Sequence, residues 1–386
     1  MSALPTVETC LGLDHIVLDR LGRARVAMAA AGIDALLITG EQDIRYLAGC
    51  NGHDVKLLVT EASVSLISDR RYEEYLAPWQ ETGHFHVEIP AGRPAQLEWI
   101  GMHLAAAEIG RLHVQADHTT LTAQEGIAKA IPSLVIEATT AICGPLRMQK
   151  SPDEIEAIER AIGVQTQALH AMLADLRLGM TEGQAAARLI YEMRIRGAES
   201  ESFEPIVGSG ANASIIHHVP GASPIVPGVL LVDWGARVDG LCSDLTRTFF
   251  LGEPSEELSK VYNIVNEARL AAIAACHVGT LVHDVDAAAR NVIEAAGYGE
   301  QFAHGVGHGL GRDVHEQPFM GRAAPDVVLL EGMVVTIEPG IYLPGLGGVR
   351  LEDDVLVTDG APRVLSADLE TSFESACLAL PKKDKP

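Results

Sequence analysis

The amino-acid sequence predicts an α/β protein with two domains. Its 386 residues exceed the usual length of one domain. Up to about residue 140, short apolar runs typical of strands alternate with amphipathic helical runs. Beyond that point, two predicted helices and a group of strands are followed by two more helices and more strands. This repeated order indicates an internal duplication within the second domain.

The first domain is expected to cover residues 1–145. Its helices are predicted where apolar residues recur at helical spacing, and its strands where short apolar or alternating runs occur. The predicted helices are 21–31, 95–108 and 122–130. The predicted strands are 35–39, 55–60, 63–68, 84–89, 111–115 and 134–137. This domain contains no glycine-rich phosphate loop, so no nucleotide site is predicted in it.

The second domain is expected to cover residues 146–386. Ser151 and Glu154 form a capping-box pair around Pro152, which predicts a helix from there to about residue 176. A second capping box at Thr181-Glu182-Gly183-Gln184 predicts a helix to about residue 195. The other predicted helices are 255–276 and 285–296. The predicted strands are 228–238, 241–250, 302–315, 333–343 and 348–358.

Acidic residues outnumber basic ones by 52 to 29, which gives a formal net charge of −23. Such a chain is expected to bind neither nucleic acid nor an anionic membrane, because both select basic patches. Divalent cations, in contrast, favour carboxylates. The sequence has no apolar run long enough to span a membrane, no signal-peptide pattern at its start, and six scattered cysteines without a CxxC motif. These features predict a cytoplasmic protein.

A predicted hairpin carries the first pair of carboxylates. Asp239-Gly240 is a preferred two-residue hairpin turn, and it places Asp233 opposite Thr246. Residues two apart on a strand share a face, so Asp233 and Asp244 are expected on one face with Cα atoms roughly 7–8 Å apart. Two carboxylates at that separation can bind one cation between them.

A second pair of carboxylates flanks the turn-forming run 343–347. A hairpin centred on Gly345 places Glu338 directly opposite Glu352, with Arg350 on the same face as Glu352. Like charges that lie directly opposite each other destabilise a sheet. A positive group should therefore compensate them, either Arg350 or metal ions.

Several histidines lie close to glycines. His304 and His308 alternate with four glycines, which disfavour a helix, and in an extended chain both imidazoles point to one side. His315 follows, and the pair His217-His218 comes after a flexible loop. Taken singly, each feature is also typical of a solvated strand face or a structural histidine. Taken together, four carboxylates and an imidazole suit two divalent metal ions.

Four motifs resemble those of the pita-bread metallopeptidases, which include methionine aminopeptidase, aminopeptidase P and prolidase. They are DWGARVDGLCSDLTRTF, HGVGHGLGRDVHEQP, GMVVTIEPGIY and GGVRLEDDVLVT, and the resemblance covers about residues 150–370. The preceding domain and the junction LRMQKSPDEIEAIERA are similar to the creatinase/prolidase N-terminal arrangement. The resemblance implies a C-terminal pita-bread fold with internal pseudo-two-fold duplication, preceded by a creatinase-type α/β domain.

The resemblance also implies a centre with two divalent metal ions. Manganese is the expected metal, with cobalt and zinc as alternatives. Asp233 would bind the first ion, and Asp244 and Glu352 would bridge both. His308 and Glu338 would bind the second ion.

The resemblance assigns the remaining polar residues to catalysis and substrate binding. Catalytic roles fall on His217, Glu338 and His315. His217 would stabilise the oxyanion, and Glu338 would carry a proton to the leaving nitrogen. His304, His315 and Arg350 would position the substrate, and an arginine can bind a C-terminal carboxylate through two parallel hydrogen bonds. The resemblance further implies a homodimer.

The implied function is hydrolysis of the peptide bond before proline in Xaa-Pro dipeptides or short peptides. The fourteen-residue step from Glu338 to Glu352 is similar to that of the short, prolidase-like bacterial members. Ile216 and Arg312 depart from the usual motifs, and either change can alter the substrate pocket. Three alternatives stay open. They are an Xaa-Pro aminopeptidase acting on longer peptides, a hydrolase or lyase of this fold acting on a small molecule that is not a peptide, and a binding module without catalysis.

Overall fold

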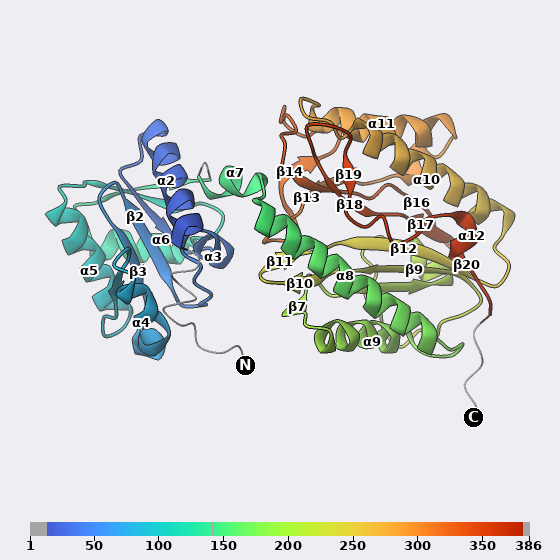
Figure 1. The fold of residues 1–386 in the computed structure, drawn as a ribbon, viewed down its shortest axis with the longest axis horizontal. Helices are drawn as coiled ribbons and strands as arrows, with labels where there is room; N and C mark the ends of the chain where they lie inside the picture. The colour runs from blue at the N-terminus through green and yellow to red at the C-terminus, as the bar shows by residue number, and fades with distance from the viewer. Residues whose placement is uncertain (1–13, 141, 381–386) are drawn as a thin grey trace. The chain divides into compact units, whose positions relative to one another are not determined.

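The computed structural model describes residues 14–140 and 142–380. The chain forms two compact units, Met1–Arg147 and Met148–Pro386 (Figure 1). Both units contain helices and strands, which confirms the predicted α/β class. Within the described residues, no helix combines the length and the apolar surface that a membrane span requires.

The first unit contains a six-stranded mixed sheet with the strand order β4-β3-β2-β1-β5-β6. Its strands are β1 (Ala35–Ile38), β2 (Lys56–Thr60), β3 (Val64–Ile67), β4 (His86–Glu88), β5 (Arg111–Gln115) and β6 (Val135–Thr139). Its helices are α2 (Asp14–Ala30), α3 (Glu41–Ala48), α4 (Glu73–Glu81), α5 (Arg93–Ala106) and α6 (Leu121–Ala130), with a 3-10 turn η1 (Arg70–Tyr72). Because side chains alternate along β1, Leu36 packs in the cluster with α2, α3 and α4, whereas Leu37 packs in the cluster with α5 and α6.

All strands predicted in this unit are present, with bounds within two residues of those expected. Helices α3 and α4 were not predicted. Helix α3 has only eight residues, and Pro78 inside α4 removes a backbone donor, which argues against a helix there. The predicted start of the first helix at residue 21 was wrong, since α2 begins at Asp14. Its apolar residues are irregularly spaced, so the pattern did not reveal the first two turns.

Two pairs of helices support the second unit. They are α8 (Pro152–Asp175) with α9 (Glu182–Ile195), and α10 (Glu256–Ala275) with α11 (Val282–Ala295), after the short helix α7 (Cys143–Met148). Both predicted capping boxes are present, at Ser151 with Glu154 and at Thr181 with Gln184. Helices α8 and α9 contribute to one apolar cluster, and α10 and α11 to another. The predicted order of two helices and strands, repeated once, is therefore confirmed.

The strands of the first half form a four-stranded sheet, β20-β12-β9-β8, and a three-stranded sheet, β11-β10-β7. They are β7 (Ser200–Glu201), β8 (Ile206–Ser209), β9 (Gly228–Trp234), β10 (Ala236–Val238), β11 (Leu241–Cys242), β12 (Leu245–Leu251) and β20 (Cys377–Leu378). Asp239 and Gly240 have φ angles of 50° and 77°, as the predicted turn requires. The long predicted strands are interrupted at Gly235 and at Ser243-Asp244, where the chain passes from one sheet to the other.

The strands of the second half form a five-stranded sheet, β14-β13-β15-β18-β19, and the pair β16-β17. They are β13 (Gly307–Gly309), β14 (Glu316–Met320), β15 (Val334–Ile337), β16 (Gly340–Leu343), β17 (Gly347–Arg350), β18 (Asp353–Leu356) and β19 (Arg363–Val364), followed by α12 (Phe373–Ala376). The predicted strands 333–343 and 348–358 are each broken once, at Glu338-Pro339 and at Leu351-Glu352. Pro339 has no N–H, so it cannot continue the ladder.

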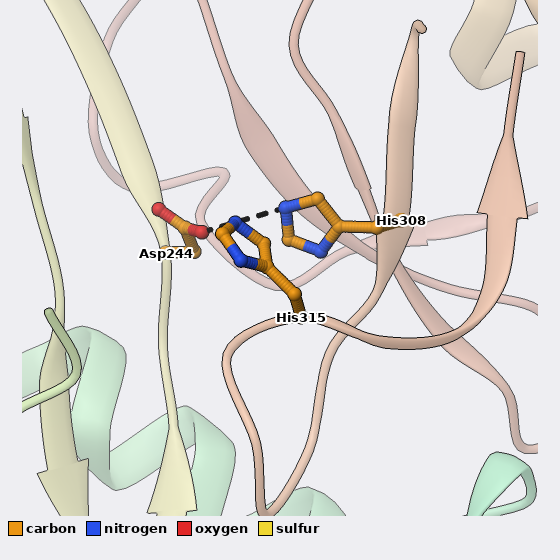
Figure 2. A group of neighbouring side chains, drawn as sticks. All are labelled: Asp244, His308 and His315. Carbon is orange, nitrogen blue, oxygen red and sulfur yellow. Dashed lines mark ion pairs between the residues drawn. The ribbon is translucent and has the colours of Figure 1, made fainter. Parts of the chain in front are cut away.

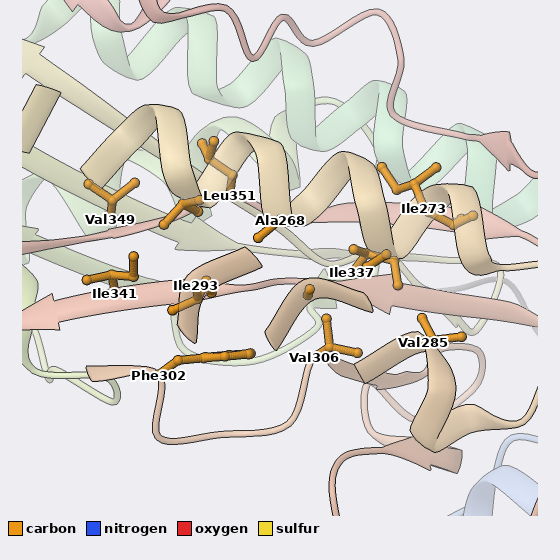
Figure 3. Packing of buried hydrophobic residues seen from close by; sticks show 14 of the residues in the cluster. Ala268, Ile273, Val285, Ile293, Phe302, Val306, Ile337, Ile341, Val349 and Leu351 are labelled. Atoms are coloured by element: carbon orange, nitrogen blue, oxygen red, sulfur yellow. The ribbon is translucent and has the colours of Figure 1, made fainter. Parts of the chain in front are cut away.

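Apolar side chains of α10 and α11 face those of β15, β16 and β17 (Figure 3). Ala268 and Ile273 come from α10, Val285 and Ile293 from α11, and Ile337 from β15. Burial of these side chains holds β15, β16 and β17 against α10 and α11.

The single strand predicted over residues 302–315 was wrong. Only Gly307–Gly309 forms β13. Here the backbone of neighbouring segments approaches too closely for a regular strand with side chains on both faces. A Cβ on Gly307 would lie 2.0 Å from the carbonyl oxygen of Thr336, and one on Gly309 would lie 2.2 Å from that of Gln317. The glycines therefore permit close backbone contact on one side.

Candidate metal centre

Asp233 and Asp244 lie beside the break in the first hairpin. Asp233 is in β9 opposite Thr246, as the turn predicted. Asp244 lies between β11 and β12, where its backbone N–H donates to Oδ2 of Asp354 over 3.2 Å. Both side chains are buried. Together with Glu352 they form a group whose ligand oxygens lie within 4.8 Å of one another.

Glu338 and Glu352 lie at the corresponding break in the second hairpin. Ile337 pairs with Asp353 on one side, and the ladder resumes in the same register between β16 and β17, which sets Glu338 opposite Glu352. The hydroxyl of Thr246 donates to Oε2 of Glu352 over 2.7 Å. This hydrogen bond joins the two hairpins at the point where their acidic residues meet.

His308 brings an imidazole to these carboxylates from β13. Its Nε2 lies 3.4 Å from Oε1 of Glu338 and 3.7 Å from Oδ2 of Asp244. The ring of His315 packs edge-on against His308, with 4.3 Å between ring centroids. Potential ligand atoms of His308, Glu338 and Glu352 lie within 4.8 Å of one another, and so do those of Asp244, His308 and His315 (Figure 2).

Burial makes the four carboxylates hard to ionise together. It raises the pKa of Glu338 to about 8, even though Arg350 favours the charged form. Burial also raises the pKa values of Asp244 and Glu352 well above their ordinary range, and neighbouring carboxylates add to this effect. The pKa of Asp233 is raised by burial as well, although Arg350 opposes the rise.

Burial has the opposite effect on the histidines, because their charged form is a cation. It lowers the pKa of His308 to about 3, and the neighbouring His315 adds to the lowering. It lowers the pKa of His304 to about 4, with repulsion from Arg350 as a second cause. The pKa of His315 is lowered by burial too. These imidazoles are neutral near pH 7, which is the state that binds metal ions.

Arg350 connects this cluster to a neighbouring tyrosine. Its terminal nitrogens donate to Oδ2 of Asp233 over 2.5 Å and to the hydroxyl of Tyr342 over 2.9 Å. Its Nε donates to Oγ1 of Thr246 over 3.0 Å. The Tyr342 hydroxyl also lies 2.8 Å from Nε2 of His304. Arg350 therefore joins Asp233 and, through Thr246, Glu352 in one hydrogen-bonded network.

The donor set fits divalent metal ions. Oδ1 of Asp233 is buried and has no hydrogen-bond partner among the described residues. A buried carboxylate oxygen without a partner is costly, and a bound cation would satisfy it. Carboxylate oxygens and neutral imidazoles are ligands for manganese, cobalt and zinc ions. The cluster is therefore a candidate site for divalent metal ions.

The cluster opens into a cavity of about 660 Å³. All the site residues predicted from the sequence line this cavity: His217, Asp233, Asp244, His304, His308, His315, Glu338, Arg350 and Glu352. Apolar side chains form the rest of the wall, among them Phe203, Ile216 and Phe319. A cavity of this size and mixed lining suits a small molecule or a short peptide.

Comparison with known proteins identifies the family. The model of metallopeptidase family M24 matches residues 156–359, which is more than half of the chain. The chain belongs to metallopeptidase family M24. The creatinase/prolidase N-terminal domain matches residues 20–149.

Solved structures similar to this M24 metallopeptidase extend over most of its length. An Xaa-Pro dipeptidase from Bacillus anthracis is 34% identical, with a TM-score of 0.86 over 91% of this chain and 97% of that chain. An X-Pro aminopeptidase from Thermotoga maritima is 31% identical, with a TM-score of 0.81 over 92% of this chain and 100% of that chain. By sequence, an Xaa-Pro dipeptidase from Pyrococcus furiosus is 41% identical over 227 residues, which are 58% of this chain and 65% of that protein. These findings confirm the predicted family and its pita-bread fold.

Two residues of the metallopeptidase's site were not selected by the sequence analysis. Thr246 lies two residues beyond Asp244 in the predicted strand 241–250, so the rule that placed Asp233 and Asp244 on one face also indicated Thr246. Tyr342 had no such signal, because its role depends on contacts with His304 and Arg350 that only the folded hairpin brings about.

The two motif departures have different positions in the metallopeptidase. Ile216 lines the cavity. Arg312 is buried, and its guanidinium donates to Oε1 of Glu154 over 2.9 Å. Arg312 therefore ties its loop to the start of α8, whereas Ile216 is the departure that lies at the cavity.

Proposed function

We propose that this metallopeptidase hydrolyses the peptide bond before proline in Xaa-Pro dipeptides. One observation carries the proposal: the two acidic hairpins and His308 converge on a cavity that also has apolar walls and further histidines. The likeness to Xaa-Pro dipeptidases from Bacillus anthracis and Pyrococcus furiosus supports the same substrate class.

We further propose that the centre holds two divalent metal ions, manganese in the first place, with cobalt or zinc as alternatives. Asp233 would bind one ion, His308 and Glu338 the other, and Asp244 and Glu352 both. Two groups of potential ligand atoms support this assignment, one formed by Asp233, Asp244 and Glu352 and the other by His308, Glu338 and Glu352. When bound, such ions polarise a carbonyl group and lower the pKa of water.

The chain's own residues supply the remaining steps. His217 donates a hydrogen bond to the substrate carbonyl oxygen as that oxygen gains negative charge. Glu338 accepts a proton from the attacking water and passes it to the proline nitrogen, which must be protonated to leave. His315, whose ring packs edge-on against that of His308, would assist catalysis from the same cavity.

The cavity walls fit a proline residue. Phe203, Ile216 and Phe319 offer apolar surface to the ring. Proline is rigid, so it loses little conformational freedom on binding, whereas a flexible residue in its place costs more ordering entropy. His304 and His315 line the same cavity, where they would position the proline side of the substrate.

The test is hydrolysis of a small peptide panel by protein loaded with manganese, cobalt or zinc. Ala-Pro and Met-Pro should be cleaved well, Ala-Ala poorly, and Xaa-Pro tripeptides more slowly than the dipeptides. Removal of metal with a chelator should abolish turnover. Failure to cleave any proline peptide would leave a small-molecule hydrolase or lyase of the same fold, or a binding module, as the alternative.

An Xaa-Pro aminopeptidase is the second candidate. The likeness to the X-Pro aminopeptidase from Thermotoga maritima, which covers 92% of this chain, favours it. Faster cleavage of tripeptides than of dipeptides would decide for this candidate. The homodimer and the cytoplasmic location expected from the sequence stay predictions.

A further inference from the structure

A buried glutamate in the first half binds the chain segment that carries His217. Glu182 lies in the first turn of α9 and is completely buried. Its Oε1 accepts hydrogen bonds from the backbone N–H of Ser209 over 2.8 Å and from Nδ2 of Asn212 over 3.0 Å. Its Oε2 lies 2.8 Å from Nε2 of His218. One carboxylate thus holds three points of the segment 209–218.

His217 lies between these points and faces the cavity, whereas the next residue, His218, contacts Glu182. After the 3-10 turn η2 (Gly210–Ser214), residues 215–218 belong to no helix or strand. Their backbone is held by turn hydrogen bonds, such as that from the N–H of His218 to the carbonyl oxygen of Ile215 over 3.2 Å. No helix or strand fixes His217, so its orientation depends on these turns and on the side-chain contacts of Asn212 and His218 with Glu182.

The second half contains a parallel arrangement. Asp286 in α11 is buried and accepts a hydrogen bond from the backbone N–H of Val306 over 3.0 Å. Arg290, which is paired with Asp286, donates to the carbonyl oxygen of His304 over 2.7 Å. In both halves, a buried acid on the second helix holds a loop whose histidine lines the cavity. The loops follow the second helix in each of the two repeated halves, and in both halves the segment held in this way carries a histidine that lines the cavity.

We propose that Glu182 is a positioning residue that fixes the orientation of His217 through His218 and Asn212. The inference rests on the proposed function, in which His217 donates to the developing oxyanion. A hydrogen-bond donor stabilises that charge only if it is held in place before the reaction, and misplacement by about 1 Å can lower a rate by about 100-fold.

The first experiment compares kinetic constants of two variants with a matched control. His218→Phe keeps a ring but removes the contact with Glu182, and Glu182→Leu removes all three contacts. Glu192→Leu is the control, because Glu192 is a buried glutamate of the same helix whose partners are Arg188 and Arg196. We expect His218→Phe and Glu182→Leu to lower kcat by about 10- to 100-fold with KM nearly unchanged. Equal kcat values for Glu182→Leu and Glu192→Leu would overturn the proposal.

A double-mutant cycle separates positioning from general stability. If Glu182 and His218 act through His217, then His218→Phe has less than about a twofold effect on kcat in a His217→Ala background. Independent, additive effects would overturn the proposal. Because Glu182→Leu leaves the buried N–H of Ser209 and two partly buried side-chain donors without an acceptor, it can fail to fold. His218→Phe therefore carries this test.

A spectroscopic measurement tests the positioning without any catalysis. In protein with ¹⁵N-labelled histidine, the ring signals of His217 are assigned by their loss in His217→Ala. They should shift or broaden in His218→Phe and stay unchanged in Glu192→Leu, and unchanged signals in His218→Phe would contradict the proposal. If the wild-type protein cleaves no proline peptide, the proposed function fails, and this measurement still decides whether Glu182 and His218 position His217.

Discussion

Arg350 donates a hydrogen bond to Oδ2 of Asp233 over 2.5 Å, and both side chains are buried. The other two guanidinium nitrogens donate to Tyr342 and Thr246. All three nitrogens of the arginine are thus engaged within the protein. These contacts hold the guanidinium beside Asp233, so the geometry favours a role in orienting that carboxylate.

Arg350→Lys should therefore weaken metal binding. A lysine ammonium cannot reproduce the planar set of donors that reaches Asp233, Tyr342 and Thr246. We expect the metal concentration for half-maximal activity to rise by about 10- to 100-fold, as for other residues that orient metal ligands. Titration of activity with manganese checks this, and dipeptides and tripeptides should be affected alike. A rise in KM for dipeptides alone would instead show that Arg350 binds the substrate carboxylate.

Asp244→Asn should remove both metal and activity. Asp244 shares one group of potential ligands with Asp233 and Glu352 and another with His308, so its loss affects the whole centre. We expect elemental analysis to find about two metal ions per chain in the loaded wild-type protein and fewer in the variant, with activity lowered by more than about 100-fold.

Asp239→Asn provides the control for this substitution. Asp239 lies in the turn of the same hairpin, is exposed and pairs with Arg160 over 2.6 Å. Asparagine tolerates the positive φ angle of that position. Metal content and activity should therefore equal those of the wild type, and a loss comparable to that of Asp244→Asn would mean that the centre has been assigned to the wrong part of the hairpin.

The hairpins of the centre could be predicted because local rules determine them. The turn at Asp239-Gly240 fixed the register of Asp233 against Thr246, and the turn around Gly345 fixed Glu338 against Glu352. Contacts between elements far apart in the sequence could not be predicted in this way. The contact between Tyr342 and His304 and the contacts of Glu182 depend on how separate elements pack.

Gly307→Ala should destabilise the protein strongly, since its Cβ would lie 2.0 Å from the carbonyl oxygen of Thr336. The strand β13 or β15 would have to move, and overpacking of this kind typically costs about 1–3 kcal/mol. Gly163→Ala is the matched control, because Gly163 lies within α8 and a Cβ there meets nothing within 4 Å. Alanine should stabilise that helix by about 1 kcal/mol. Denaturant unfolding measures both changes, and a neutral Gly307→Ala would contradict the close approach of the strands.

The raised pKa values of the carboxylates predict how pH affects the metal-free protein. A carboxyl group whose pKa is higher in the folded than in the unfolded state binds more protons when folded, so its stabilising effect is present at low pH and is lost as pH rises through the folded-state value. For Glu338 that value is about 8, against an ordinary value of 4.5. The histidines with lowered pKa values, such as His308 and His304, have the opposite effect, but it is complete above their unfolded value of 6.5.

The thermal midpoint of metal-free protein should therefore decrease as pH rises from about 7 to about 8.5. The free energy of unfolding should decrease by up to about 1.4 kcal/mol per pH unit for each such carboxyl. Manganese should stabilise the protein more at the higher pH, because metal binding requires deprotonated ligands and releases protons. A glutamine at position 338 cannot ionise. The metal-free midpoint of Glu338→Gln should therefore depend less on pH than that of the wild type. Thermal unfolding followed by circular dichroism at both pH values, with and without manganese, measures all three effects. A metal-free midpoint that rises over this range, or one with the same slope in Glu338→Gln, would show that Glu338 is ionised in the folded protein before any cation binds.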